Sequence, residues 1–444
     1  MRVVPAAVVV SLLAPCAFAQ DAALDTWLDR ELPALVAGYK ALHAAPELSH
    51  HEEKTSALVA KELRGLGYEV TEKVGKYPKP DITGYGVVAV MKNGAGPTVL
   101  VRADMDALPV EEKTGLPYAS TVRAKNDAGQ EVPVMHACGH DVHVTALLGA
   151  AKALAARKDR WKGTLVLVGQ PAEEMIDGAR ALLADGLYTR FPKPTVAIAL
   201  HDDSGREAGA IVVVPGYALA SSTGVEVVVR GVGGHGSRPE ASKDPIVLAA
   251  QLVLSLQTIV SRENRPFDPA VVSVGAIHGG LKNNIIPDDV RLLLTIRTYK
   301  EEVRQRILAS IERMARGLAA AAGVPEDLAP TVTVMETTTA LYNDPELTRR
   351  LKAVFERAFG KDKVSEGEPV MGSEDFGLFG LEDRSVPVLQ LGVGAADPAK
   401  VAESKASGKP LPSLHSSLFA PQPEPTIRAA VKALTVAVLD LAKP

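Results

Sequence analysis

The segment VMHACGHDVH, Val134–His143, gathers residue types that bind metal ions. It holds three histidines, one cysteine and one aspartate. Imidazole nitrogens and a thiolate suit Zn²⁺, and nickel, cobalt and manganese are alternatives. Gly139 separates Cys138 from His140 and gives the backbone freedom to direct both side chains inward. The segment indicates a metal site, and a buried apolar role for the cysteine is the alternative.

The isolation of this cysteine strengthens the metal interpretation. The only other cysteine, Cys16, lies in an N-terminal apolar run that ends in the small-residue pattern AFA. This pattern predicts a signal peptide, residues 1–19, cleaved after Ala19, and a lipoprotein anchor at Cys16 is the alternative. Export to the periplasm or the medium usually exposes thiols to oxidation. Because no partner for a disulfide would remain, a bound metal would explain how Cys138 persists.

Acidic residues follow three apolar runs elsewhere in the chain. The clusters are RADMD at 102–106, QPAEE at 170–174 and LHDD at 200–203. Ligand sites in open α/β sheets collect beyond the carboxyl ends of the strands, so we expect these clusters to meet. Bringing Asp104, Asp106, Glu173 and Glu174 together would be costly through repulsion and desolvation unless a cation compensates. A divalent metal would supply that compensation.

The elements that must position these clusters alternate along the chain. Continuous Val/Ile/Leu runs start near residues 86, 98, 163 and 195, and they are typical of strands buried on both faces. Helical patterns cover 24–44 and 141–156, with Asp141 expected to cap the second. This alternation predicts a layered α/β domain.

From residue 221 the pattern changes to strand-helix-strand-strand-helix-strand, the ferredoxin-like order. Asp244-Pro245 is expected to begin the first of these helices. We expect residues 221–336 to form an inserted domain. Residues 20–220 and 337–444 would then make up one discontinuous α/β domain.

The composition of the chain limits the classes of partner that we expect it to bind. The 444 residues carry a net charge of −4, which becomes −5 once Arg2 is removed, and no basic cluster is present. This argues against nucleic acid as a partner. After signal cleavage no segment is expected to approach membrane-spanning length, so no membrane contact is expected. Residues 395–412, rich in Ala, Pro, Gly and Lys, are expected to form a surface loop.

Seven motifs occur along the chain: RADMDALPVEE, MHACGHDVH, QPAEEMIDGARALLADGL, GGHGSRPE, NNIIPDD, MGSEDFG and LHSSLF. Together they resemble the M20 metallopeptidases, and most of all the amidohydrolase branch of aminoacylases, hippurate hydrolases and indole-acetyl-amino-acid hydrolases. The resemblance extends from about Leu42 through the last helix. It implies a metal-dependent hydrolase domain with an inserted domain that acts as lid and dimerisation module.

The resemblance also implies roles for individual residues, beginning with two divalent metal ions per subunit, zinc first. The implied metal ligands are Cys138, His140, Glu174, His201 and His415. Glu173 corresponds to the general base and Asp106 to the residue that orients a ligand or metal. In more distant relatives a histidine ligand precedes that aspartate. Here Asp104 occupies the position and the cysteine replaces the lost ligand, which favours the amidohydrolase branch.

The resemblance implies that three further residues contact the substrate or the partner subunit. His235, in the inserted domain, corresponds to a histidine that reaches the active site of the partner subunit, which implies a homodimer or larger assembly. Asn284 and Arg297 correspond to residues that hold the substrate carboxylate, and for Arg297 a strand charge partner is the alternative.

The remaining histidines are expected to have structural roles. We expect His136 and His143 to support the site, His43 to line its mouth or pack, and His278 to end a strand. His50 and His51 are interpreted as a solvated helix start.

The expected function is cleavage of the amide bond of N-acyl amino acids by metal-activated water. A dipeptidase or carboxypeptidase with the same machinery is the first alternative. A cysteine hydrolase built on Cys138 and a non-enzymatic metal-binding protein are the others.

Overall fold

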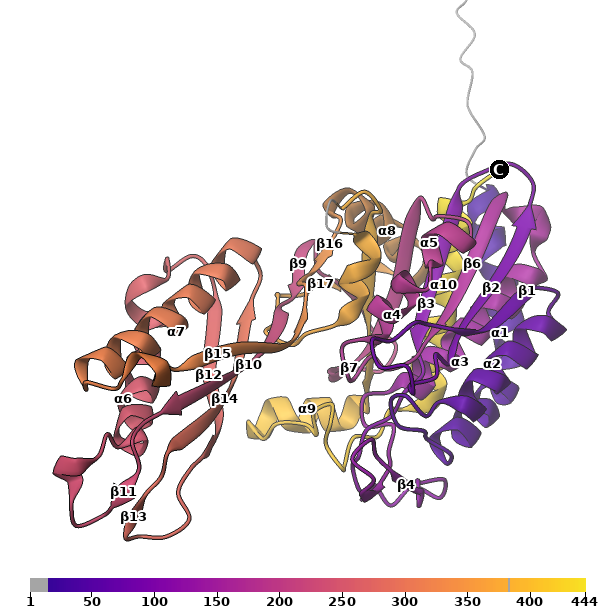
Figure 1. Ribbon diagram of the computed structural model, residues 1–444. Coiled ribbons are helices and arrows are strands. Elements are labelled where there is room, and N and C mark those ends of the chain that lie inside the picture. The colour runs from indigo at the N-terminus through magenta and orange to yellow at the C-terminus, as the bar shows by residue number, and fades with distance from the viewer. Residues whose placement is uncertain (1–14, 382–383) are drawn as a thin grey trace, which may run out of the picture.

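A computed structural model describes residues 15–381 and 384–444, which form two lobes (Figure 1). The expected signal peptide, residues 1–19, lies mostly outside the described residues, so its cleavage after Ala19 stays a prediction. The chain enters the larger lobe through helix α1 (Pro15–His43).

An eight-stranded sheet forms the centre of the larger lobe, in the order β1-β2-β6-β3-β7-β18-β8-β17. The strands are β1 (Glu69–Val74), β2 (Gly86–Asn93), β3 (Thr98–Asp104), β6 (Gly163–Gln170), β7 (Val196–Glu207), β8 (Ile211–Val213), β17 (Val364–Glu366) and β18 (Val388–Ala396). The central strands β6, β3, β7 and β18 run parallel to their neighbours in this group, so their carboxyl ends share one edge. Strands β1 and β2 extend the sheet in antiparallel fashion.

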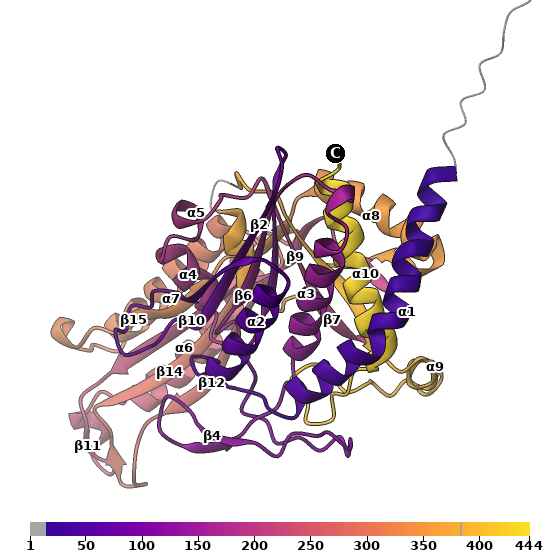
Figure 2. The same cartoon turned by 90° about the vertical axis from the view of Figure 1, so that its right-hand side faces the viewer.

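Both faces of this sheet are buried, as the uninterrupted apolar runs predict. Alternate residues of β2 enter different cores: Val87 and Ala89 enter one, and Val88 and Val90 the other. The first core is covered by α1, α2 (Glu53–Gly65), α3 (His140–Ala155), α8 (Pro345–Phe359) and α10 (Pro423–Leu441). The second is covered by α4 (Gly178–Ala184) and α5 (Leu187–Arg190). Figure 2 shows these helices on opposite sides of the sheet.

The smaller lobe is a four-stranded antiparallel sheet in the order β12-β14-β10-β15. Its elements are β10 (Ser221–Arg230), α6 (Pro245–Thr258), β12 (Ala270–His278), β14 (Asp289–Thr298), α7 (Glu301–Ala321) and β15 (Thr331–Thr338). Val225, Val227 and Val229 of β10 pack with both helices on one face. The strand and helix order is the ferredoxin-like one predicted, and the exact division of the chain at 221 and 336 stays our proposal.

Helix α6 begins as its sequence predicts. The side chain of Asp244 accepts a hydrogen bond from the backbone N–H of Ile246, and Pro245 occupies the first turn. With the following turn (Ile259–Glu263), the apolar stretch Pro245–Glu263 is long and apolar enough to cross a membrane, and a third of it is buried. Our expectation that no such segment follows the first twenty residues was therefore wrong. Length and composition alone are weak evidence, because the core helix of a soluble protein passes the same test.

Short ribbons complete the structure. Strands β9 (Gly216–Leu219) and β16 (Leu341–Asn343) pair where the chain passes between the lobes. Strands β11 (Gly234–His235) and β13 (Ile285–Ile286) pair at the far end of the smaller lobe (Figure 1). Strands β4 (Arg123–Lys125) and β5 (Glu131–Pro133) form a hairpin on the larger lobe.

Two local predictions were wrong. Residues 395–412 are not only loop, because α9 (Pro398–Ser407) forms there, capped by the Asp397 side chain and followed by Gly408 at φ +71°. Asp141 does not cap α3, because the helix begins one residue earlier, at His140, after Gly139. The Asp141 carboxylate instead accepts a hydrogen bond from His43, 2.7 Å away.

Candidate active site

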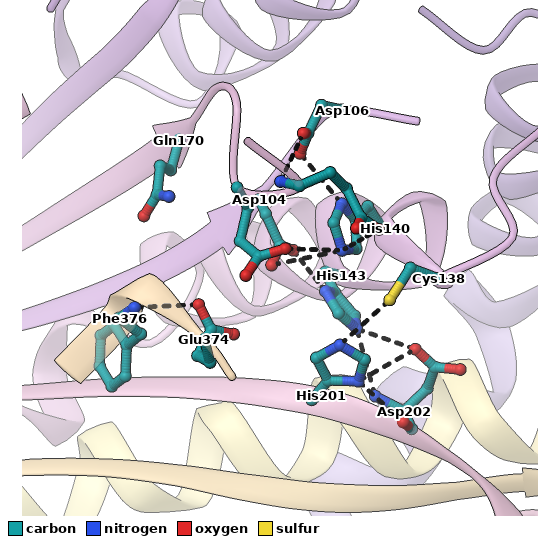
Figure 3. A network of polar contacts seen from close by, with 12 residues as sticks. Asp104, Asp106, Cys138, His140, His143, Gln170, His201, Asp202, Glu374 and Phe376 are labelled. Carbon is teal, nitrogen blue, oxygen red and sulfur yellow. Dashed lines mark hydrogen bonds and ion pairs between the residues drawn. The ribbon is translucent and has the colours of Figure 1, made fainter. Parts of the chain in front are cut away.

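The predicted residues Asp106, Cys138, His140 and His201 converge beyond the carboxyl ends of β3 and β6, beside β7 (Figure 3). The first turn of α3 contributes His140, and Cys138 directly precedes that helix. His201 lies within β7, and a loop before α10 contributes His415. The shared edge of the parallel strands therefore gathers side chains from segments that are far apart in the sequence.

Three nitrogen and sulfur donors face one another. The Cys138 Sγ atom lies 3.6 Å from His201 Nε2, and together with a ring nitrogen of His140 these atoms lie within 4.8 Å of one another. The other ring nitrogen of His201, Nδ1, donates to the backbone carbonyl of Asp202 over 2.8 Å. This hydrogen bond leaves Nε2 as the lone-pair atom that faces the sulfur.

A second group of donors overlaps the first. Cys138, Glu174 and His415 offer ligand atoms within 4.8 Å of one another, and so do His140, Glu173 and Glu174. His415 Nε2 lies 3.5 Å from one carboxylate oxygen of Glu174. The structure thus brings together all five residues predicted as metal ligands, with the predicted base Glu173 beside them.

Two buried polar atoms in this cluster lack a hydrogen-bond partner among the described residues. They are Nε2 of His140 and Oε1 of Glu174, which lie 3.9 Å apart. An unsatisfied buried polar atom is costly, so such atoms require a partner. Sulfur, imidazole and carboxylate donors at this spacing fit a divalent transition-metal ion.

Asp106 organises the cluster through hydrogen bonds to two of its members. Its Oδ1 accepts a hydrogen bond from His140 Nδ1 at 3.1 Å. Its Oδ2 accepts from the backbone N–H of Glu174 at 2.9 Å and from the Ser49 hydroxyl at 2.7 Å. One carboxylate therefore orients both a histidine and a glutamate of the cluster, in agreement with its predicted orienting position.

Gly139 lets the chain turn between Cys138 and His140. Its φ is +76°, and a Cβ atom at this position would lie 2.2 Å from a carboxylate oxygen of Asp202. Both the backbone conformation and the available space therefore require glycine. We expected the conformational freedom of Gly139 from the sequence, but not the close approach of Asp202.

A buried charge network supports the cluster, and sequence reasoning assigned no role to most of it. Arg102, fully buried, donates to Asp104 at 2.6 Å, Glu374 at 2.8 Å and Asp375 at 3.1 Å. Its Nε also donates to Gln170 at 2.8 Å. The sequence did contain an indication of this network, because an arginine inside a buried apolar strand requires acidic partners.

His143 extends this network and has the supporting position expected of it. Its Nδ1 contacts Asp104, and its Nε2 lies 3.0 Å from Asp202 Oδ1. His136 is also buried, and neither of its ring nitrogens has a partner among the described residues. Burial lowers the pKa of His136 to about 4, so this imidazole is neutral.

Glu173, Glu174 and Cys138 hold their protons more tightly than usual. Burial raises the pKa of Glu174 to about 7, and burial followed by repulsion from Glu374 raises that of Glu173. Burial, then the nearby Glu174 carboxylate, raises the pKa of the Cys138 thiol. A positive charge at the centre of the cluster would reverse these shifts, since it favours the ionised forms.

A cleft of about 960 Å³ opens onto this cluster. Cys138, Glu173, Glu174, His201 and His415 line it together with aliphatic side chains, and no Phe, Tyr or Trp is among its described lining residues. Arg297 of β14 also lines it, from the sheet face opposite the two lid helices, and donates to Ser373 Oγ at 2.6 Å.

Two predicted residues lie outside this cleft. His235 is exposed in β11, where its ring nitrogen accepts a hydrogen bond from Ser237, and it does not line the cleft of its own chain. Asn284 also does not line it, but its carbonyl accepts from the N–H of Gly236. The two residues therefore lie next to each other, apart from Arg297.

Four further histidines have definite positions. His43 packs, as one of the two expectations had it, and contacts Asp141 and Glu112. His278 ends β12 as expected. The interpretation of His50 as solvated was wrong: it is 8% exposed and contacts Asp127 and Asp177, whereas His51 is exposed.

Comparison with known proteins identifies relatives. Residues 100–407 match peptidase family M20/M25/M40. The chain is 38% identical over 340 residues to hippurate hydrolase of Campylobacter jejuni, covering 76% of this chain and 82% of that relative. It is 36% identical over 340 residues to thermostable carboxypeptidase 1 of Saccharolobus solfataricus, covering 76% and 80%. A solved Bacillus subtilis structure, described as a dinuclear metal binding peptidase from the M20 family, aligns with a TM-score of 0.74 at 27% identity, covering 94% of this chain and 100% of that chain.

The fold and the site define a metallohydrolase that acts on amide bonds. The chain belongs to peptidase family M20/M25/M40, in its amidohydrolase branch. The resemblance seen in the seven motifs is thereby confirmed, and so is the fold class of an α/β hydrolase domain with a lid.

Proposed function

We propose that this protein hydrolyses the amide bond of N-acyl amino acids, releasing a carboxylic acid and a free amino acid. The hippurate hydrolase relative supports this substrate class. The observation that carries the proposal is one cleft lined by four of the five metal-ligand candidates, by Glu173 and by Arg297, with the fifth candidate, His140, buried beside the other four.

Two divalent metal ions fit the overlapping ligand groups, and a dinuclear relative supports this number. Zinc is the first expectation, with manganese, cobalt and nickel as alternatives. Cys138, His140, Glu174, His201 and His415 would hold them. Such ions lower the pKa of water and polarise a carbonyl group.

Glu173 has the properties of a proton carrier. It is buried, and one of its carboxylate oxygens lies 3.9 Å from His140 Nε2. Its carboxylate lines the cleft beside the metal-ligand candidates. In the proposed reaction Glu173 accepts a proton from the attacking water and passes it to the departing amide nitrogen.

Arg297 would orient the substrate. A guanidinium group binds a carboxylate through two parallel hydrogen bonds, and Arg297 presents its half-buried group to the cleft. The acyl group would then lie against the aliphatic lining, which includes Val212, Leu219 and Val370. Holding both ends places the amide bond beside Glu173.

The proposed functional unit is at least a homodimer. His235 and Asn284 lie together at the far end of the smaller lobe, outside the cleft of their own chain. They would complete the cleft of a partner subunit, with His235 donating to the developing oxyanion and Asn284 to the substrate carboxylate.

We also propose that the protein is secreted or periplasmic and begins at Gln20 after cleavage. The N-terminal apolar run and the AFA pattern support this location. Intact mass measurement of protein recovered outside the cytoplasm tests the cleavage point. A chain that retains Cys16 would indicate another form of processing.

A panel of substrates tests the proposed activity. The purified metal-loaded protein is expected to hydrolyse N-benzoyl and N-acetyl amino acids faster than dipeptides or longer peptides. Chelator should abolish turnover, and brief iodoacetamide treatment should not. Inhibition by iodoacetamide alone would favour a cysteine hydrolase, and the absence of any steady turnover would favour a metal-binding protein.

Dipeptidase or carboxypeptidase activity is the second candidate. The carboxypeptidase relative favours it, and Arg297 could bind the C-terminal carboxylate of a peptide equally well. Faster cleavage of peptides than of acyl amino acids in the same panel would establish this alternative.

A further inference from the structure

His50 lies between two carboxylates from different parts of the chain. Its Nδ1 is 2.9 Å from Asp127 Oδ2, and its Nε2 is 3.2 Å from both oxygens of Asp177. The imidazole is 5% exposed, whereas the two aspartates are about a third to a half exposed. Both ring nitrogens therefore face acceptors.

Such an arrangement requires the charged form of the ring. A neutral imidazole has one N–H donor, and the imidazolium has two. Burial by itself would lower the pKa of His50, but the hydrogen bonds to Asp177 and Asp127 raise it to about 9. At neutral pH His50 is thus an imidazolium that donates to both aspartates.

These contacts join three segments. His50 lies just before α2, Asp127 lies in the loop of the β4–β5 hairpin, and Asp177 follows the Glu173–Glu174 pair by three residues. The His50 contact to Asp177 therefore ties down the loop between β6 and α4. That loop carries the two glutamates of the proposed site.

The loop is held in an unusual backbone conformation. Ala172 and Ile176 have φ values of +51° and +58°, and His50 itself has +67°. Non-glycine residues adopt such values only where surrounding contacts compensate. Beside His50, the Glu52 carboxylate provides one such contact by accepting from the N–H groups of Ala172 at 2.8 Å and His50 at 3.1 Å.

The other groups that face His50 are few. The ring of Tyr77 lies edge-on at 4.9 Å between centroids, and Glu52 contacts the backbone of His50. His51 donates to the second oxygen of Asp127 at 3.0 Å, but it is exposed and forms neither a hydrogen bond nor an ion pair with Asp177. His50 is therefore the histidine of this cluster that reaches the loop.

We propose that His50 is a positioning residue, which by its hydrogen bonds to Asp127 and Asp177 fixes the loop that places Glu173 and Glu174. Only the expected effect on kcat rests on the proposed function. The positioning itself can be measured without any substrate.

The matched variants are His50→Gln and His51→Gln. Both remove an imidazole that contacts Asp127, but only the first removes the contact to Asp177. For hydrolysis of N-benzoylglycine, His50→Gln is expected to lower kcat by about 10- to 100-fold, the usual effect of a small misplacement of catalytic groups. His51→Gln should leave kcat within about twofold, because an exposed ion pair contributes little.

The pH profile separates positioning from simple stabilisation. His50 loses its second donor as the pH rises through about 9, so wild-type kcat should fall over that range. His50→Gln should lack this fall, and His51→Gln should keep it. A variant that only folds less stably would keep the wild-type profile with a lower melting temperature.

Hydrogen–deuterium exchange gives a readout that does not depend on the reaction. Amides of residues 172–178 should exchange at least about tenfold faster in His50→Gln than in the wild type and His51→Gln, while amides of β6 stay protected. If His50→Gln does not fold, Asp177→Ala removes the same contact and is expected to give the same result.

Two results would overturn the proposal. One is unchanged exchange of residues 172–178 in both His50→Gln and Asp177→Ala. The other is an equal effect of His50→Gln and His51→Gln on exchange and kcat. If the wild type cleaves no acyl amino acid, the proposed function fails, and the exchange experiment still decides the role of His50.

Discussion

His140 donates a hydrogen bond from Nδ1 to Oδ1 of Asp106 over 3.1 Å. This contact fixes which ring nitrogen carries the proton, and it leaves Nε2 facing the cluster as a lone-pair donor. Nε2 has no other partner among the described residues. A carboxylate behind a metal-binding histidine also increases the basicity of the ring, so Asp106 would support metal binding through His140.

The adjacent glutamates should separate chemistry from metal binding. Glu173→Gln is expected to lower kcat/KM by about 10²- to 10⁴-fold with unchanged metal content, because it removes the proton carrier. Glu174→Gln should instead lower metal content, since its carboxylate lies among the cysteine and histidine donors. Metal analysis and kinetics on both variants test this, and loss of metal in Glu173→Gln would contradict the assignment.

Arg102 should be essential for stability. Replacing it by methionine leaves Asp104, Glu374 and Asp375 buried without their cation, and breaking a buried ion pair costs about 3–5 kcal/mol. Urea unfolding measures the effect. Arg123→Met, which removes an exposed pair with Glu131, is the control and should change the free energy of unfolding by less than about 1 kcal/mol. Similar losses in both variants would be inconsistent with the buried network.

Arg297 should recognise a substrate carboxylate. For N-benzoylglycine, Arg297→Met is expected to raise KM by about 10- to 100-fold, the usual effect of losing a hydrogen bond to a charged group. For N-benzoylglycinamide, which lacks the carboxylate, wild type and variant should have similar KM values. Arg206→Met, at another arginine of the cleft, is the control. An equal rise for both substrates would indicate a structural role for Arg297.

Stability should depend on pH through His43. Burial would lower its pKa, but Asp141 and Glu112 raise it from 6.5 to about 10. When folding raises the pKa of a group, its protonated form stabilises the folded protein. This stabilisation is complete at pH values below the pKa of the unfolded chain, and it is lost as the pH rises through the pKa of the folded protein. The urea midpoint of the wild type should therefore fall between pH 6.5 and about 10 more steeply than that of His43→Gln. Parallel curves would exclude this contribution.

Subunit mixing tests whether His235 acts on a partner. His235→Ala and Glu173→Gln homodimers should each be nearly inactive, because each lacks one component of every site. A mixed dimer would contain one site with both components, so exchange of subunits should restore part of the activity. A mixture that stays inactive after verified exchange would place His235 outside the reaction.

The sequence predicted the framework of the site well, because the signals were local. Uninterrupted apolar runs identified the central strands, and the acidic or imidazole residues at their ends had to share the edge where parallel strands finish. Gly139 likewise showed that Cys138 and His140 could point the same way.

The rest depended on contacts between segments far apart in the chain. Arg102 meets Glu374 and Asp375 across about 270 residues, which no local period records. His50 looked like a solvated helix start because Asp127 and Asp177, its partners, follow much later. His235 lies outside the cleft of its own chain, and the role proposed for it involves a second chain, which no pattern within one sequence records.

The absorption spectrum of the cobalt-substituted protein tests the central claim, that the Cys138 thiolate is a metal ligand. The wild type should show a thiolate-to-cobalt charge-transfer band in the near ultraviolet, and Cys138→Ser with cobalt bound should lack it. A wild-type spectrum without this band, or a band that persists in Cys138→Ser, would contradict the account.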